Sequence, residues 1–152
     1  MIDSVNSGSA ESCSTGKKII IDADVSKLPV LQDFLDKHLE NKNCPMSVTM
    51  EIQIAAEEMF ANIANYAYPE GGGNMEVCIS FTEGKPCVMT LVFTDSGVPF
   101  DPLAKTDPDV TLSAFERQVG GLGIYMTKKS MDDLAYVYQD GQNIFTMKKM
   151  LA

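Results

Sequence analysis

The chain lacks the features that mark several protein classes. It contains no tryptophan and a single histidine, His38, and none of its apolar runs approaches the ~20 residues that cross a bilayer. Its four cysteines (Cys13, Cys44, Cys78 and Cys87) show no C-x-x-C spacing. A membrane span is therefore excluded and a zinc site disfavoured, and we expect a cytoplasmic protein with reduced thiols.

Basic residues are also scarce. Lys and Arg number 12 against 21 Asp and Glu, giving a formal net charge of −9. Binding to nucleic-acid phosphates depends on Lys and Arg to release counterions, so this balance argues against direct nucleic-acid binding. The expected partners are proteins or small molecules.

The length of 152 residues suits one domain. Residues 1–16 are rich in Ser and Gly and lack the basic start and apolar stretch of a signal peptide. We expect a disordered leader over residues 1–16 and a single domain over residues 17–152.

The hydrophobic pattern predicts the order β-α-α-β-β-loop-α-β-β. A β-branched strand covers residues 18–21, and leucines then recur at helical spacing to residue 39. In a second helix, Ser47 is the expected N-cap, and the apolar stripe comprises Ile52, Ala55, Ala56, Met59, Ile63 and Ala67.

Two hairpins and a long loop complete the pattern. Strands 75–82 and 86–94 flank a Gly-containing turn, and strands 134–138 and 143–149 flank another, with a helix predicted over residues 122–131. Residues 96–123 form an unusually long connection of the kind used for lids and binding loops. The fold class is an α/β (α+β) two-layer sandwich, with a mixed, largely antiparallel sheet covered on one face by helices.

The second helix carries a polar flank beside its apolar stripe. Glu58, Asn62 and Asn65 are spaced four and three residues apart and share one helical face. Glu-x-x-x-Asn is common on solvated helices, so the pattern alone does not establish a site.

Two glycine-containing segments follow. Asp95-x-Gly97 comes directly after an apolar strand, where a turn is the simple interpretation and close backbone approach to a ligand the functional one. Gly120-Gly121-Leu-Gly123 opens a helix whose amides could face phosphate oxygens. Neither the P-loop nor the dinucleotide-binding pattern occurs in the chain.

These three segments occur in an order that resembles the N, G1 and G2 boxes of the GHKL ATPases, which bind ATP in a Bergerat fold. The stretches from Glu58 to Pro69 and from Gly120 to Met126 are most similar to those of serine kinases that act as anti-sigma factors. The resemblance covers about residues 18 to 150.

The resemblance implies a role for each residue. Asn62 would coordinate Mg²⁺, which prefers oxygen ligands, and Glu58 would be the general base of phosphoryl transfer. Asp95 would accept a hydrogen bond from the adenine amino group. The remaining nucleotide-binding residues would be Asn65 near the phosphates, Gly97, Arg117 in the lid, Gly121, Gly123, and Thr146 on the adenine side.

Two functions remain open. The first is an ATP-dependent serine kinase that binds a sigma factor and phosphorylates a serine of its anti-anti-sigma antagonist. The alternative is a non-catalytic, ATP-gated protein-binding module. A sensor histidine kinase is disfavoured because His38 has no phosphoacceptor motif. The sequence does not decide whether two copies pair as a homodimer.

Overall fold

The computed structural model describes residues 16–104 and 122–151. In chain order its elements are β1 (Lys17–Asp22), the 3₁₀ turn η1 (Val25–Lys27), α1 (Leu28–Glu40), α2 (Met46–Asn62), the π-helical turn η2 (Ile63–Ala67), β2 (Asn74–Phe81), β3 (Val88–Asp95), the 3₁₀ turn η3 (Pro102–Ala104), α3 (Leu122–Ser130), β4 (Asp133–Gln139) and β5 (Gln142–Met150). The predicted order of helices and strands is confirmed.

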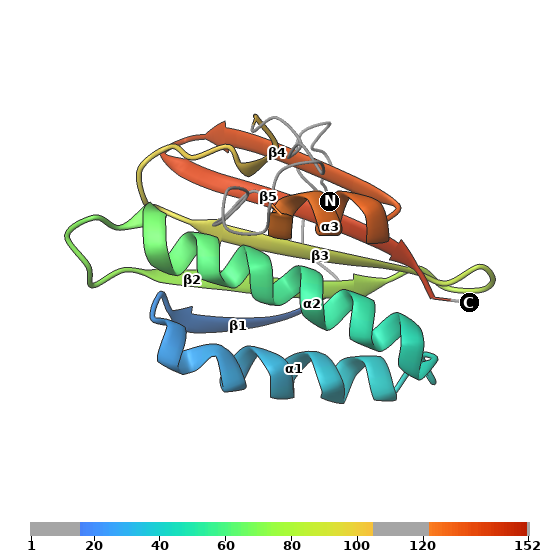
Figure 1. Cartoon of the computed structure of the whole chain (residues 1–152). Helices are drawn as coiled ribbons and strands as arrows, with labels where there is room; N and C mark the ends of the chain where they lie inside the picture. The colour runs from blue at the N-terminus through green and yellow to red at the C-terminus, as the bar shows by residue number, and fades with distance from the viewer. Residues whose placement is uncertain (1–15, 105–121, 152) are drawn as a thin grey trace.

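The five strands form one sheet in the order β1-β2-β3-β5-β4 (Figure 1). Each of the four pairings is antiparallel. Both predicted hairpins are present, and β5 inserts between β3 and β4. The register places Asp95, the last residue of β3, directly opposite Asn143 near the start of β5.

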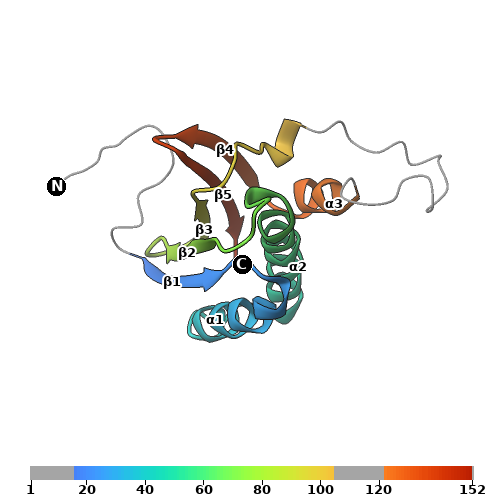
Figure 2. The ribbon, with the colours of Figure 1, turned by 90° about the vertical axis from the view of Figure 1, so that its left-hand side faces the viewer.

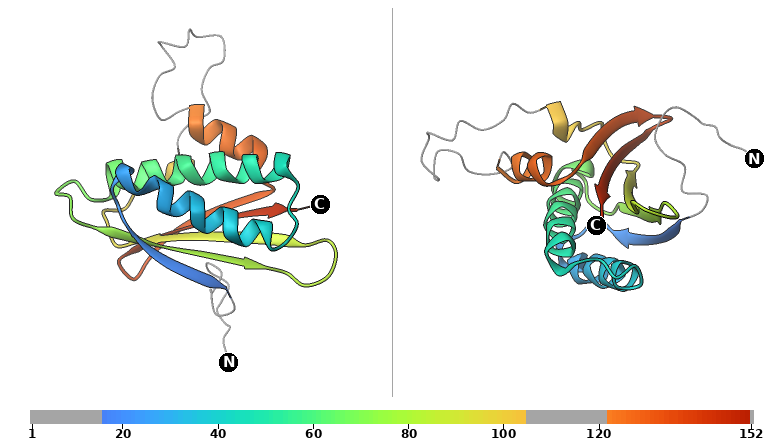
Figure 3. Two further views of the ribbon diagram at one scale, coloured as in Figure 1. Left: turned by 90° about the horizontal axis from the view of Figure 1, so that it is seen from below. Right: turned by 90° about the vertical axis from the view of Figure 1, so that its right-hand side faces the viewer.

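All three α-helices pack on one face of the sheet, as the edge-on view shows (Figure 2). Side chains alternate along each strand, so Leu91 and Phe93 of β3, together with Phe145 and Met147 of β5, enter the core between the layers. From the helical layer, Leu31, Leu35 and Leu39 of α1 are fully buried. The two-layer arrangement, visible from two further sides in Figure 3, is the one predicted.

Helix α2 lies between α1 and α3 across the sheet (Figure 1). Its predicted apolar stripe is buried from Ile52 to Ala67. The predicted Ser47 cap is wrong: α2 begins at Met46, Pro45 occupies the N-cap position, and no side chain caps the helix. Because Pro45 is extended and ends the preceding loop, the first turn starts too early for the Ser47 hydroxyl to serve as the cap.

Two further expectations concern the cysteines, which were expected to be reduced, and the helices, of which none was expected to span a membrane. Cys44 and Cys87 are free thiols, whereas Cys78 is disulfide-bonded, so the expectation of reduced thiols is wrong for Cys78. Among the described helices, none is long and apolar enough to cross a bilayer. Residues 1–15 of the predicted leader lie outside the described residues.

Candidate functional site

Helix α2 changes its winding directly after Asn62. Residues Ile63–Ala67 continue it as a π-helical turn, in which hydrogen bonds run from residue i to i+5. Such turns contain more residues per turn than an α-helix and often occur at functional sites. Asn62 therefore stands at a junction, and its side chain is buried although it is polar.

Glu58 and Asn62 form a hydrogen-bonded pair. The Asn62 amide nitrogen Nδ2 donates to the Glu58 carboxylate oxygen Oε2 and to the Glu58 carbonyl oxygen, each at 2.8 Å. Both bonds fix the direction of the Asn62 amide, so its carbonyl oxygen Oδ1 faces away from Glu58. The pair thus fixes the Glu58 carboxylate and the Asn62 amide on one flank of α2.

The backbone that follows Asp95 packs against the end of the helical layer. The Gly97 amide donates to Asp95 Oδ1 at 2.8 Å, and the Val98 amide donates to the Ala67 carbonyl oxygen at 2.8 Å. A Cβ atom on Gly97 would lie 2.2 Å from that carbonyl oxygen. A side chain at position 97 would therefore clash with the Ala67 backbone, whereas close approach of Gly97 to a ligand stays a prediction.

Asn143 connects Asp95 to the loop and to β4. Its Nδ2 donates to Asp95 Oδ1 at 2.9 Å and to the Val98 carbonyl oxygen at 2.8 Å. Its Oδ1 accepts from the Phe100 amide at 3.1 Å and from the Tyr136 hydroxyl. Asn143 thus bonds through both ends of its amide and fixes the Asp95 carboxylate in the strand.

Asp95 is a buried carboxylate whose loss of hydration is offset only in part by hydrogen bonds. Removal from water raises the pKa of Asp95 above its usual value, while the hydrogen bonds from Asn143 and Gly97 act in the opposite direction. The hydrogen bonds from Gly97 and Asn143 both reach Oδ1. A buried acceptor of this kind is a common feature of binding sites.

Asp95 and Asn143 are the polar residues of a small pocket between the two layers. Helical residues Met59, Ile63 and Ala67 line one side. The other lining residues are Phe93, Phe100, Pro102, Tyr136 and Phe145. The cavity measures about 10 Å³, so a nucleotide base could enter only if lining side chains moved.

Of the predicted nucleotide-binding residues that the structure describes, Asp95 alone lines this pocket. Asn65 is exposed and lines a separate cavity of about 520 Å³ beside Asp22, Asp24 and the Gly71–Gly73 turn. The π-helical winding turns Asn65 off the face predicted for a continuous α-helix. Thr146 alternates with Phe145 and Met147, so it points to the sheet face opposite the helices, and its hydroxyl is buried with no hydrogen-bond partner among the described residues.

The glycine-rich segment is only partly described. Gly123 is the second residue of α3, whereas Arg117, Gly120 and Gly121 lie outside the described residues. Over residues 16–104 and 122–151, no group of three or more His, Cys, Asp or Glu could hold a metal ion.

The model of the histidine kinase-like ATPase domain matches residues 21–149, which is most of the chain. This chain belongs to the histidine kinase-like ATPase family. The predicted resemblance to GHKL ATPases is confirmed, and use of ATP is the property that the family implies.

Curated relatives of this histidine kinase-like ATPase include serine-protein kinases named RsbW. Those of Bacillus cereus strain AH820 and Bacillus anthracis strain A0248 are each 26% identical over 102 residues. The matches cover 64% of this chain and 62% of each relative, so they leave over a third of either protein unmatched.

Solved structures share the fold. The RsbU and RsbW domains of Rv1364c from Mycobacterium tuberculosis give a TM-score of 0.63 at 15% identity, covering 91% of this chain and 33% of that one. The SiaB-SiaC complex from Pseudomonas aeruginosa gives 0.55 at 19% identity, covering 88% of both chains. At these identities the likeness establishes the histidine kinase-like fold alone.

Sequence reasoning missed two residues of this histidine kinase-like site. Asn143 has no local motif, and only its register opposite Asp95 shows its importance. Tyr68 donates to the Asn74 carbonyl oxygen at 2.6 Å and accepts from the Ser96 amide at 2.9 Å. Tyr68 thereby joins the end of the helical layer to the ends of β2 and β3.

Proposed function

We propose that this chain binds Mg²⁺–ATP between the end of α2 and the β3–β5 edge and transfers the γ-phosphoryl group to a serine of a protein partner. The observation that carries the proposal is the Glu58–Asn62 pair, in which the Asn62 amide nitrogen donates to the Glu58 carboxylate at 2.8 Å, so that one helix holds a base and an amide that can bind a metal. The family membership of residues 21–149 supports the same assignment.

Adenine recognition is assigned to the Asp95 end of the pocket. The Asp95 carboxylate is an acceptor for the exocyclic amino group of adenine, and apolar residues such as Ile63 and Phe93 would contact the ring. Asn143 and Gly97 hold the carboxylate in place. Guanine carries an oxygen where adenine carries this amino group, so Asp95 would repel it.

The donor set at Asn62 fits Mg²⁺. The ion prefers oxygen ligands and retains several waters, and the Asn62 carbonyl oxygen faces away from Glu58. Asn62 would hold the ion, and the chemistry that Mg²⁺ would supply is neutralisation of the phosphate charge. Gly123, the second residue of α3, is proposed to contact the phosphates together with Gly121 and Arg117, which lie outside the described residues.

Glu58 is proposed as the general base of the transfer. The acceptor serine oxygen forms a bond to the γ-phosphorus while the bond from that phosphorus to the bridging oxygen breaks, and ADP leaves. Glu58 accepts the proton that the serine hydroxyl loses. Hydrogen bonding to Asn62 keeps the carboxylate beside the metal-binding oxygen.

The proposed partners follow from the kinship with serine-protein kinases. We propose an anti-sigma factor that binds a sigma factor and phosphorylates an antagonist of the sulfate-transporter/anti-sigma-antagonist class. A cytoplasmic location is part of this proposal. No nucleic-acid contact is proposed, because the net charge of −9 opposes it.

Isothermal titration tests the nucleotide site first. The wild-type protein should bind ATP with Mg²⁺ and lose most of that affinity without it. Asn62→Ala should lose the Mg²⁺-dependent component, whereas Glu58→Gln should keep ATP affinity within about twofold because the base is separate from the metal ligand. Equal affinity of wild type and Asn62→Ala would refute the metal assignment.

Phosphoryl transfer is then tested with purified antagonist proteins of the same organism and radiolabelled ATP. Wild-type protein should label one serine, and an antagonist with that serine changed to Ala is the control. Glu58→Gln should reduce the rate by about 10²–10⁴-fold. ATP binding without transfer to any antagonist would favour the non-catalytic, ATP-gated module.

A further inference from the structure

The outer face of α2 carries an apolar ridge that no described element covers. Met46, Met50 and Ile54 recur at four-residue spacing, and their side chains are 72%, 56% and 57% exposed. The opposite side of the same helix is buried from Ile52 to Phe60. Packing within the domain therefore does not account for the ridge, and exposed apolar rows of this kind mark interaction sites.

The ridge leads to the proposed catalytic base. Each step of four residues advances about 40° round an α-helix, so one further step from Ile54 reaches Glu58. Glu58 lies between the exposed ridge and the buried Asn62. A protein seated on Met46, Met50 and Ile54 would therefore have a neighbouring segment directly beside Glu58.

We propose that this ridge docks the protein whose serine accepts the phosphoryl group, an inference that rests on the proposed kinase function. The acceptor hydroxyl must come within hydrogen-bonding distance of Glu58, so its protein must occupy the surface beside that residue. Met126 of α3, the helix packed next to α2, is a further exposed apolar side chain, 51% exposed.

Charge defines the partner further. Helix α2 contains Glu51, Glu57 and Glu58 and no basic residue. Glu57 is exposed and lies on the ridge side of the helix. The docking face of the partner is therefore an apolar patch with Lys or Arg beside it.

The same charges argue against a second copy of this chain as the occupant. A symmetric pairing of two α2 ridges would bring Glu57 of each copy into one interface without a basic residue on either helix. Like charges facing each other cost affinity. The ridge thus favours a partner of opposite charge.

The test is steady-state kinetics with the antagonist protein that the wild type phosphorylates. Met50→Gln combined with Ile54→Gln keeps helix-forming side chains of similar length, so thermal stability and ATP affinity should not change. The KM for the antagonist should rise about tenfold or more, with kcat within about twofold. Val30→Gln, at an exposed apolar position of α1, is the matched control and should leave KM unchanged.

A charge variant gives an independent reading. Glu57→Lys should raise the KM for the antagonist more than Glu57→Gln does, because it places like charges together.

An unchanged KM in the double glutamine variant, with transfer intact, would overturn the docking role alone. Loss of a dimer in sedimentation by that variant would instead assign the ridge to self-association and overturn the proposal. If the wild type phosphorylates no antagonist, the kinase function fails and the docking role fails with it.

Discussion

Asp95 is a buried carboxylate, and its burial and its hydrogen bonds shift its pKa in opposite directions. Burial raises the pKa of Asp95, and hydrogen bonds from Asn143 and Gly97 offset only part of the effect. The ionised carboxylate therefore costs folding free energy that a neutral residue of the same shape would not. Carboxylates with a pKa perturbed in this way cluster at functional sites.

The pH dependence of ATP binding should follow the raised pKa of Asp95. As pH falls through that value the carboxylate gains a proton, the acceptor loses its charge, and ATP affinity drops. Stability has the opposite sign, because the folded protein binds the proton more readily than the unfolded one and unfolding free energy falls as pH rises through the raised pKa. Titration calorimetry and urea unfolding between about pH 4 and 8 measure both trends.

Asp95→Asn should separate the effect of Asp95 on ATP affinity from its effect on stability. The amide oxygen can keep the bonds from Asn143 and Gly97, so we expect unfolding free energy at neutral pH equal to or above that of the wild type. ATP affinity should fall about 10- to 100-fold, as expected for a lost hydrogen bond to a charged group of ~1.5–3 kcal/mol. Retained affinity with a wild-type pH profile would remove Asp95 from the base pocket.

Gly97→Ala should destabilise the protein by about 1–3 kcal/mol. Its new methyl group would meet the Ala67 carbonyl oxygen at 2.2 Å and separate the Val98–Ala67 hydrogen bond. Ser96→Ala is the control, since Ser96 is exposed and its backbone amide would keep its bond to Tyr68. Equal urea midpoints for the two variants would contradict the close approach at Gly97.

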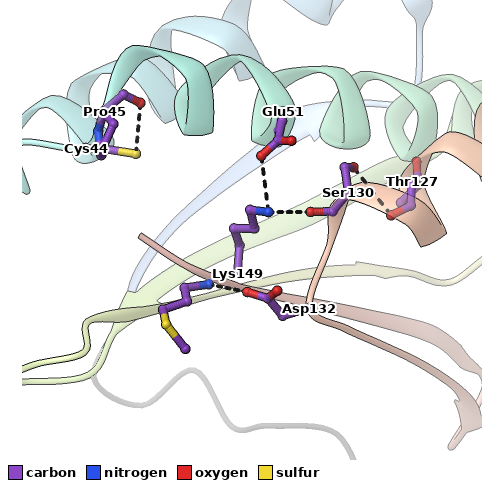
Figure 4. Close-up of polar contacts among 8 residues, drawn as sticks. Cys44, Pro45, Glu51, Thr127, Ser130, Asp132 and Lys149 are labelled. Atoms are coloured by element: carbon purple, nitrogen blue, oxygen red, sulfur yellow. Dashed lines mark hydrogen bonds and ion pairs between the residues drawn. The ribbon is translucent and has the colours of Figure 1, made fainter. Parts of the chain in front are cut away.

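At the scale of elements, Lys149 holds α3 and α2 together (Figure 4). Its Nζ donates to the Ser130 carbonyl oxygen at the end of α3 at 2.6 Å and pairs with Glu51 of α2 at 3.1 Å. A cation suits the negative end of a helix. Because the Lys149 side chain is only 14% exposed, this contact is more protected from water than a surface ion pair.

Lys149→Met should lower unfolding free energy by about 1–3 kcal/mol and speed hydrogen exchange in α3. Glu51→Gln should have a smaller effect, because the Glu51 side chain is 46% exposed and the bond to Ser130 remains. Urea unfolding and amide exchange measure the two quantities. A larger loss in Glu51→Gln than in Lys149→Met would show that the ion pair, and not the helix end, matters more.

The elements themselves were predictable because their periodicity reflects burial. The stripe from Ile52 to Ala67 and the alternation in β3 and β5 follow directly from one buried face each. The π-helical turn after Asn62, which contains Asn65, was not predictable, since it leaves no hydrophobic signature. The register of β5 against β3, which selects Asn143 and turns Thr146 away, also depends on tertiary pairing.

At the scale of the molecule, the proposed site lies at one end of the interface between the two layers. Met59 and Ile63 come from the helices, and Asp95 and Asn143 come from adjacent antiparallel strands. A ligand in this site would therefore contact residues of both layers, which lie together only in the folded state. Any such ligand raises the stability of the whole domain by mass action.

Mg²⁺–ATP at about 100 times its Kd should add ~2.7 kcal/mol to the unfolding free energy. For a domain of this size that corresponds to an increase in Tm of roughly 5–10 °C. Asn62→Ala should lose the Mg²⁺-dependent part of this increase, and GTP should give little, because guanine presents an oxygen to Asp95. Thermal unfolding with ATP, ATP plus EDTA, and GTP separates the contributions. An equal shift with GTP would contradict base recognition by Asp95, whereas an equal shift with EDTA would contradict the role of Asn62 and leave Asp95 in place.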